Sequence, residues 1–214
     1  MKILKDFLSS VLAGVMISFG GTVFLCAESK VVGALFFSLG LCVILMQGFL
    51  LFTGKSAYVF QNKPTYLLWL LLIWIGNLCG CALMGLIVKA ARFPIAQKAT
   101  EICSAKLEQT PIATMLLGAL CGILVYIAVD YYKNPSDTYP FSKYLLVFTC
   151  VPAFILCGFE HSVADMFYFA ASSDMLLYSS KGILYILYVT VGNLVGAIVF
   201  HNIKKFVIAK KADS

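Results

Sequence analysis

Charged side chains are scarce in this sequence. Only 12% of the 214 residues are Asp, Glu, Lys or Arg, whereas 61% are hydrophobic. A soluble domain is about a quarter charged and about half apolar. One soluble core of this size cannot hold such an apolar excess. The composition therefore predicts an integral membrane protein whose surroundings are a lipid bilayer.

Motifs of catalysis and metal binding are also lacking. The chain has two histidines, and Cys79 and Cys81 have no second pair at zinc-site spacing. It has no nucleophile elbow and no phosphate-binding loop. We therefore expect no metal, no cofactor and no enzymatic activity. A membrane enzyme with His161 and Glu160 as acid and base is an alternative that no further motif supports.

Long uncharged runs are what the chain has instead. Each is about 20 residues long or longer, enough for a helix to cross a hydrocarbon core of about 30 Å. Helices are expected because backbone polar groups in lipid must pair within the segment. A sixth crossing over 144–171 is interrupted by Glu160, His161 and Asp165, which indicates a discontinuous helix. The uninterrupted runs are 7–27, 31–54, 64–88, 109–129 and 182–200.

Positive charges lie mainly at the ends of these runs, where they anchor helices at the membrane surface. The net charge of +6 therefore does not indicate nucleic acid as a partner. Lys2 and Lys5 precede the first run as in a signal peptide, but that run opens a series of similar ones, so we interpret it as a retained helix. Six crossings put both termini on one side. The lysine distribution favours the cytoplasm for that side, in a bacterial-type inner (plasma) membrane.

Two short motifs recur in the same order along the chain. Residues 76–80 read Gly-Asn-Leu-Cys-Gly, and residues 192–196 read Gly-Asn-Leu-Val-Gly. The Gly-Phe pair at 48–49 returns at 158–159. These recurrences indicate that a unit of three helices occurs twice in the chain.

Because three is an odd number, the second set of helices enters the membrane from the opposite side. The sequence therefore predicts a single transmembrane domain built as an inverted 3+3 repeat. The repeats are expected to cover about 7–89 and about 109–203, with Gly14 set against Gly118 in their first helices.

The second and fifth helices are both predicted to be broken. In the repeat alignment, residues 50–55 occupy the position of residues 160–165. Gly54 permits backbone conformations outside the helix. Inverted repeats with broken helices place a site near the middle of the membrane.

His161 is the residue that the sequence singles out. An ionisable group at membrane depth is costly and indicates function. Neighbouring residues of a helix point about 100° apart, so we expect His161 to face a lumen and Glu160 to brace the break by accepting freed backbone N–H groups. Thr53, on the other broken helix, offers a hydroxyl that both donates and accepts. Local packing between helices is the alternative for these side chains.

Lys55 and Asp165 are mates in the repeat. We expect them either to form a salt bridge that joins the two breaks or each to reach an aqueous mouth. Lys106, just before the fourth helix, is expected to attract anions at a pore mouth, with a solvated loop lysine as the alternative. Asn77 and Asn193 lie within apolar runs and are expected to form hydrogen bonds between helices.

Several stretches resemble a known family. Residues 158–167 read Gly-Phe-Glu-His-Ser-Val-Ala-Asp-Met-Phe, which is similar to the G-F-E-H-S-x-A-N-M-F signature of formate/nitrite transporters. Residues 51–54 resemble that family's L-F-T motif, and Gly-Asn at 192–193 is similar to its sixth-helix motif. Lys106 precedes Gly118 at the spacing of the family's vestibule lysine and fourth-helix glycine. The resemblance covers nearly the whole chain.

The resemblance implies an aquaporin-like protomer of six helices that assembles as a homopentamer with one pore per subunit. It implies transport of small monovalent anions such as formate, nitrite or hydrosulfide. By position, His161 and Thr53 correspond to the family's central polar pair. Its hydrophobic constrictions fall at Leu51, Phe52, Val125 and Phe154.

The chain departs from the family pattern at three positions. Asp165 stands where the signature has asparagine, Leu50 where the second helix has glutamate, and Lys55 where that helix often has asparagine. A Lys–Asp pair is therefore expected to replace a neutral pair. Because little sequence precedes the first helix, gating by a terminal segment is not expected.

Desolvation decides the transport mechanism that we expect. The free energy of moving a bare anion from water into a dry constriction is far above thermal energy, whereas for a neutral acid it is only a few kcal/mol. We expect the anion to take up a proton, directly or through water or His161, and to cross as the neutral acid. An aquaporin-like pore for neutral solutes is the alternative, although the asparagine-proline-alanine pair of aquaporins is absent.

Overall fold

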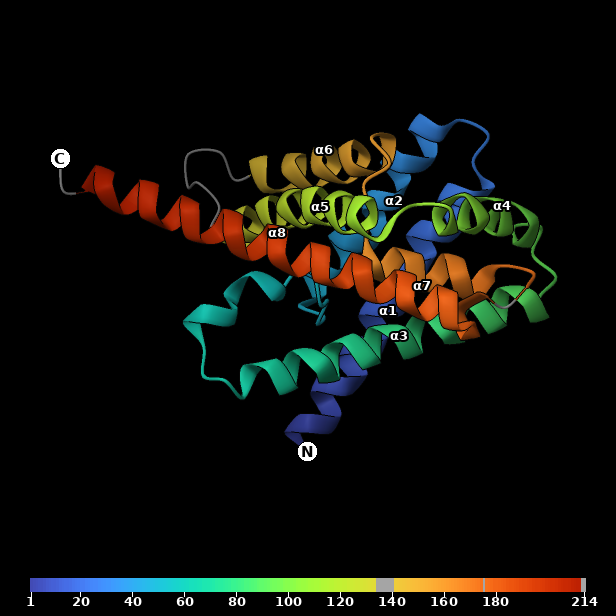
Figure 1. Ribbon diagram of the computed structural model, residues 1–214, viewed down its shortest axis with the longest axis horizontal. Helices are drawn as coiled ribbons and strands as arrows, with labels where there is room; N and C mark the ends of the chain where they lie inside the picture. Colours follow the sequence, from blue (N-terminus) through green and yellow to red (C-terminus); the bar gives the residue numbers. More distant parts are fainter. Residues whose placement is uncertain (134–140, 175, 213–214) are drawn as a thin grey trace.

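The computed structural model describes residues 1–133, 141–174 and 176–212 (Figure 1). Every regular element in these ranges is helical, as the sequence predicts, and no described residue belongs to a β-strand. In chain order the elements are α1 (Lys2–Cys26), α2 (Lys30–Gln47), η1 (Ser56–Gln61), α3 (Tyr66–Ala90), α4 (Ala96–Leu107), α5 (Pro111–Lys133), α6 (Ser142–Leu156), α7 (Ser162–Ala171), η2 (Leu176–Tyr178) and α8 (Ser180–Ala212).

Five of these helices, α1, α2, α3, α5 and α8, are long and apolar enough to cross a membrane. Large apolar side chains cover their outer surfaces; for example, Phe19, Leu86 and Val195 are 47%, 50% and 48% exposed. A surface of this kind is costly in water and is the expected surface in lipid. The chain is an integral membrane protein. α6 and α7, with 15 and 10 residues, are each too short to cross alone at about 1.5 Å per residue.

The two halves of the chain are packed alike and interlock. α5, α6 and α8 lie side by side along the long axis, with α4 near one end and the C-terminus at the other (Figure 1). α1 packs on α2 and α3, and α5 packs in the same way on α6 and α8. The short segments are exchanged, because α7 packs on α3 of the first half and η1 packs on α8 of the second.

Glycines allow the long helices to approach closely, and their contacts correct one sequence alignment. A Cβ at Gly14 would lie 2.2 Å from the Asn77 carbonyl oxygen, and a Cβ at Gly122 would lie 2.3 Å from that of Asn193. These matching contacts align Gly14 with Gly122, and not with Gly118 as the sequence suggests. Gly118 and Gly122 lie one turn apart on the same face of α5, so glycine spacing alone does not distinguish them.

α4 lies outside the uncharged runs from which the sequence predicts helices. α4 is an amphipathic helix in which Ala99 and Cys103 are buried and Glu101 is exposed. A short amphipathic helix contains no long apolar run, so a search for uncharged runs passes over it. Its last turn carries Lys106.

Gly80 tests the close packing of α3 on α1. A Cβ at Gly80 would lie 2.2 Å from the Val11 carbonyl oxygen, so we expect Gly80→Val to force the helices apart and to cost at least ~1–3 kcal/mol of stability. Cys79→Val, on the neighbouring exposed position, is the matched control and is expected to change little. Thermal unfolding in detergent measures both. Equal melting temperatures of the two variants would contradict the described packing.

Candidate functional site

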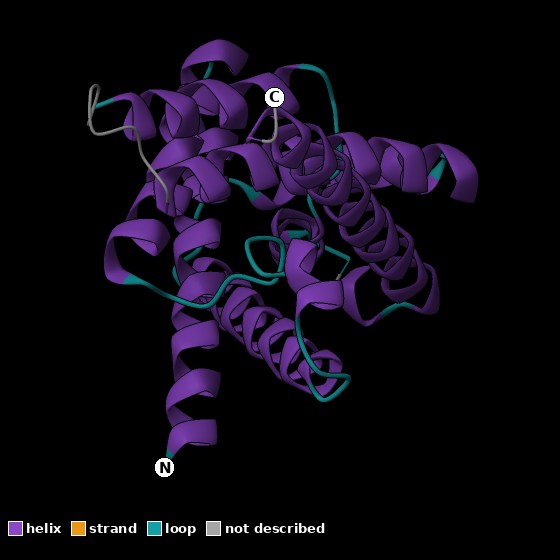
Figure 2. Cartoon of the chain, turned by 90° about the vertical axis from the view of Figure 1, so that its left-hand side faces the viewer, coloured by secondary structure: helices purple, strands orange, loops and turns teal. Residues whose placement is uncertain are grey.

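Two helices end just before buried segments that carry Thr53 and His161, and both end in the same way. Gly48 follows α2 and Gly158 closely follows α6, with φ of 71° and 70°, a left-handed conformation that favours glycine. The next residue in each case, Phe49 or Phe159, donates its N–H to a carbonyl of the ending helix at 3.0 and 2.9 Å. The recurring Gly-Phe pair is therefore a helix stop. Figure 2 shows non-helical segments among the surrounding helices.

Asn193 satisfies the backbone that the stop after α6 leaves open. Its Oδ1 accepts the Ser162 N–H at 2.9 Å, and its Nδ2 donates to the carbonyls of Glu160 and Gly118 at 2.7 and 2.8 Å. The Asn193 side chain is fully buried. Unpaired backbone groups in lipid cost several kcal/mol each, so Asn193 fixes the path of the chain between α6 and α7.

Asn77 does the same for the stop after α2. Its Oδ1 accepts the Phe52 N–H at 2.9 Å, and its Nδ2 donates to the carbonyls of Leu50 and Ser10 at 2.9 and 2.7 Å. Each amide therefore binds one N–H and one carbonyl of a helix stop, together with one carbonyl of a neighbouring helix. The Gly-Asn motif shared by α3 and α8 is a pair of backbone braces.

His161 and Thr53 meet between the two stops. The His161 Nε2 and the Thr53 Oγ1 lie 3.0 Å apart, and both side chains are buried. His161 also caps α7, because its Nδ1 accepts the Ala164 N–H at 3.1 Å. A neutral imidazole carries one N–H group. Because Nδ1 is an acceptor here, Nε2 carries the proton and donates a hydrogen bond to the Thr53 Oγ1. The Phe154 ring stacks on the imidazole, with ring centroids 5.7 Å apart.

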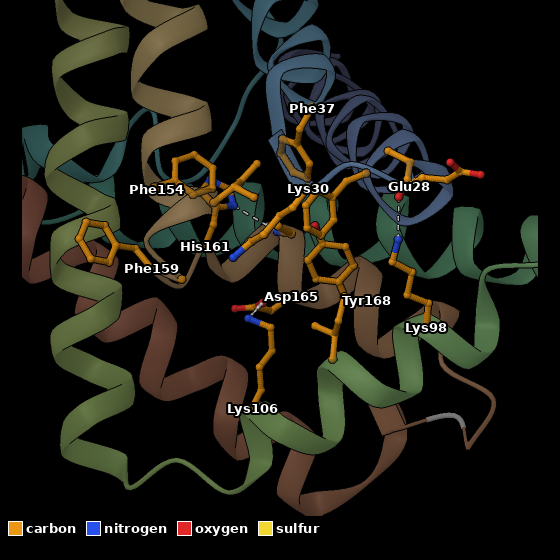
Figure 3. A pocket seen from close by; sticks show the side chains of 16 residues that line it. Glu28, Lys30, Phe37, Lys98, Lys106, Phe154, Phe159, His161, Asp165 and Tyr168 are labelled. Atoms are coloured by element: carbon orange, nitrogen blue, oxygen red, sulfur yellow. Dashed lines mark hydrogen bonds and ion pairs between the residues drawn. The ribbon is translucent and has the colours of Figure 1, made fainter. Parts of the chain in front are cut away.

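Lys106 is paired with two carboxyl groups. Its ammonium contacts Glu160. It also lies 3.0 Å from the Asp165 Oδ1, as Figure 3 shows. Burial acts to lower the pKa of the Lys106 ammonium, but the two carboxyl groups outweigh burial and raise that pKa above its usual value. Lys106 therefore stays charged, while its neighbours offset the charge. Lys106 alone therefore gives its surroundings no uncompensated positive charge that would attract anions.

Lys55 and Asp165 do not form the salt bridge that the sequence left open. Asp165 binds Lys106 instead, and Lys55 lines a cavity elsewhere. The repeat mates diverge because the chain continues as η1 after the first stop and as α7 after the second. Lys55 and Asp165, which depart from the family pattern, therefore do not replace a neutral pair of that pattern with an ion pair.

Two cavities lie at opposite ends of α5. We name them the Lys106 cavity and the Lys55 cavity, with volumes of about 400 and 360 Å³. Lys106 lies just before α5 and Lys133 is its last residue, and the 23 residues of α5 span about 34 Å. Lining residues of the Lys106 cavity include Glu28, Lys30, Lys98, Phe154, His161 and Asp165 (Figure 3). Those of the Lys55 cavity include Leu41, Leu51, Gly54, Tyr132 and Lys133.

Two of the four residues expected at the constrictions line these cavities. Phe154 lines the Lys106 cavity and Leu51 lines the Lys55 cavity. Phe52 and Val125 line neither of the two and are 5% and 1% exposed. His161 lines the Lys106 cavity, and Thr53 directly precedes Gly54, which lines the Lys55 cavity, so the polar pair links the residues around the two cavities.

Comparison with known proteins identifies the family. Residues 1–206 match the sequence profile of the formate/nitrite transporters. The chain belongs to the formate/nitrite transporter family. The nitrite transporter NirC of Salmonella typhimurium strain LT2 is 30% identical over 194 residues, covering 83% of this chain and 70% of NirC. The formate channel FocA of Escherichia coli strain K12 is 28% identical over 186 residues, covering 77% of this chain and 65% of FocA.

Solved structures in this family have the same fold. A structure titled FNT family ion channel matches with a TM-score of 0.85 at 26% identity, covering 96% of this chain and 90% of that chain. A pentameric formate channel with formate bound matches with a TM-score of 0.80 at 27% identity, covering 97% and 98%. The named relatives are transporters and channels and not enzymes, which agrees with the sequence-based prediction.

Several polar residues of the site are not predicted from the sequence. Gln109 donates to the Glu160 carboxylate at 3.0 Å. Lys30 and Lys98 line the Lys106 cavity and donate to backbone carbonyls at 3.3 and 2.9 Å. For Lys98, the amphipathic pattern of α4 is the sequence feature that could have indicated its place in a helix beside the site. Within the described ranges, no group of three or more His, Cys, Asp or Glu side chains is placed to hold a metal ion.

Asn193→Leu tests the brace in this transporter. The substitution leaves the Ser162 N–H and the Glu160 carbonyl without their partner, and each loss costs about 1–3 kcal/mol. We therefore expect a marked fall in melting temperature and in the yield of assembled protein. Asn202→Leu, which changes an exposed asparagine of the same helix, is the control. A melting temperature of Asn193→Leu equal to that of the control would exclude a bracing role.

Proposed function

We propose that this chain is a channel or transporter for small monovalent anions of weak acids: formate, nitrite or hydrosulfide. The His161–Thr53 pair carries the proposal, because it is a buried polar contact between two cavities that are otherwise separated by apolar side chains. The names of the relatives support the substrate class. The pathway runs from the Lys106 cavity past Phe154 and the polar pair to Leu51 and the Lys55 cavity.

The topology that we propose is a six-crossing inverted repeat, with the halves at about 7–89 and 109–203. The fifth crossing consists of α6 and α7, and the second consists of α2 and the segment after it. The matching contacts of Asn77 and Asn193 support this repeat. Both termini then lie on the cytoplasmic side of a bacterial-type inner membrane, as the lysine distribution favours.

A homopentamer with one pore in each subunit is the assembly that we propose. The similar formate channel is pentameric. The exposed apolar side chains of the long helices supply area both for contacts with lipid and for contacts between subunits.

Transport through the dry segment proceeds by way of the neutral acid. Lys30 and Lys98 add positive charge to the Lys106 cavity, where Lys106 itself is paired. As the anion loses water beside Phe154, its affinity for a proton rises. The neutral acid then passes the apolar side chains, and the His161 Nε2 and the Thr53 hydroxyl offer hydrogen bonds at the midpoint.

The proton reaches the anion from the bulk solution through water, and not from His161. The Nδ1 of His161 accepts the Ala164 N–H, and a doubly protonated imidazole would turn a second N–H toward that donor. Protonation of His161 would therefore remove the cap of α7. A proton that is relayed from the bulk through water in the Lys106 cavity avoids this cost and leaves no hydroxide behind.

Flux of a weak acid should rise as pH falls. Because only the neutral form crosses the dry segment, formate influx into proteoliposomes is expected to increase by up to about tenfold for each pH unit between pH 7.5 and 5.5. Nitrate, the anion of a strong acid, is the matched control and should cross slowly at every pH. Formate flux that stays flat over this range would refute the protonation step.

His161→Asn separates transport from folding. Asparagine is a good N-cap, so α7 keeps its start, but its shorter side chain does not offer Nε2 to Thr53 or to a passing acid. We expect His161→Asn to assemble normally and to lose most formate flux, and Thr53→Val to behave similarly. Gel filtration and stopped-flow acidification measure the two properties. Normal flux in both variants would remove the pair from the pathway.

A pore for neutral solutes such as water or glycerol is the alternative function. The apolar separation of the two cavities opposes it, because water needs a continuous line of hydrogen-bonding partners. Osmotic swelling of the same proteoliposomes distinguishes the two functions. Rapid swelling without acid flux would favour the neutral-solute pore.

A further inference from the structure

The two cavities carry different charge. In the Lys106 cavity the charges of Lys30, Lys98 and Lys106 are matched in number by carboxyl groups, because Lys106 is paired with Glu160 and Asp165 and Glu28 also lines the cavity. The Lys55 cavity is lined by Lys55 and Lys133, and none of its described lining residues is Asp or Glu. One end of the pathway is therefore close to electrically balanced and the other is cationic.

Lys133 is held in position from several sides. Its ammonium lies 4.8 Å from the centroid of the Tyr58 ring and 3.5 Å from the Gly54 carbonyl oxygen. Tyr58 donates its hydroxyl to Asp130 at 3.1 Å, and Asp130 also binds Lys204 at 2.5 Å. The salt bridge of Asp130 is with Lys204, and Lys133 lines the Lys55 cavity together with Lys55.

Lys55 brings the second charge from the helix stop itself. It follows Gly54 and lies two residues from Thr53, so its side chain starts beside the polar pair. The ammonium groups of Lys55 and Lys133 repel each other. Among the described residues, no carboxylate forms a salt bridge with either group. Two like charges in a partly apolar cavity are unfavourable unless an anion lies between them.

We propose that the Lys55 cavity binds one small monovalent anion between the ammonium groups of Lys55 and Lys133. The apolar part of the lining, which includes Leu41, Ile44 and Leu51, disfavours strongly hydrated divalent anions such as sulfate and phosphate. The Lys106 cavity has no equivalent site because the carboxyl groups of Glu28, Glu160 and Asp165 offset the charges of Lys30, Lys98 and Lys106. Transport is therefore asymmetric: formate that enters from the Lys55 end saturates the pathway at a lower concentration than formate from the other end.

Bromide binding tests the site without requiring transport. Crystals of the full chain grown in sodium bromide are expected to show an anomalous peak between Lys55 and Lys133 in the wild-type protein. Lys55→Gln should remove the peak. Lys63→Gln removes one charge from an exposed position further along the chain, and should retain the peak. A wild-type protein without the peak, or a Lys55→Gln protein that keeps it, would overturn the proposed site.

Lys133 requires a second pair of variants, because its contacts with Tyr58 and Gly54 also support the local structure. Lys133→Arg keeps the charge and is expected to keep the bromide peak, whereas Lys133→Gln is expected to lose it. Loss of the peak in the arginine variant, with a normal melting temperature, would show that charge at this position does not bind the anion.

Formate flux from each side tests the asymmetry, which rests on the proposed transport function. In proteoliposomes with sidedness defined by a C-terminal tag, Lys55→Gln should raise the half-saturating concentration from the Lys55 end by about tenfold. The value from the Lys106 end should not change. An equal rise from both ends would contradict the asymmetry. Absence of wild-type flux for formate, nitrite and hydrosulfide would contradict the proposed function instead, while the bromide result would still stand.

Discussion

The backbone that follows the ends of α2 and α6 must find hydrogen-bond partners inside the protein, and this requirement organises the structure. Water satisfies exposed N–H and carbonyl groups in a soluble protein, but lipid does not. Here two buried asparagines satisfy them, each with one accepting and two donating bonds. The glycines around Asn77 and Asn193 let the neighbouring helices approach closely enough for these bonds to form. A polar site at membrane depth depends on these braces.

The same interruptions supply the chemistry of the site. The segment after α2 carries Thr53. The segment after α6 leads to His161 at the start of α7. Because the cap of α7 occupies one imidazole nitrogen, the other presents its N–H to Thr53. His161 is thus a fixed hydrogen-bond donor, and in our proposal it positions a neutral acid and does not carry the proton. The two cavities differ because η1 and α7 place Lys55 and Asp165 in different surroundings.

Much of this arrangement follows from the sequence, for identifiable reasons. Uncharged runs predict the long helices because lipid excludes charge, and the recurring Gly-Phe and Gly-Asn motifs mark the helix stops and their braces. The pairing of His161 with Thr53 came from the family resemblance, and the distance between them agrees with it. The partner of Asp165 could not be predicted, because repeat alignment assumes that both halves continue alike after the stop. Gly118 was matched with Gly14 because two glycines one turn apart fit the same pattern. α4 lies outside the uncharged runs, and Gln109 stands at the start of one of them without a motif that marks its role.

The central claim is that a polar pair, held between two braced helix stops, lies on the path of a small acid. The most direct measurement is a high-resolution cryo-EM map of the protein in lipid nanodiscs, saturated with formate at pH 5.5. The account predicts density for one small molecule between Phe154 and Leu51, within hydrogen-bond distance of the His161 Nε2 or the Thr53 hydroxyl. A map in which side chains close around the imidazole, with no passage on either side of it, would contradict the account.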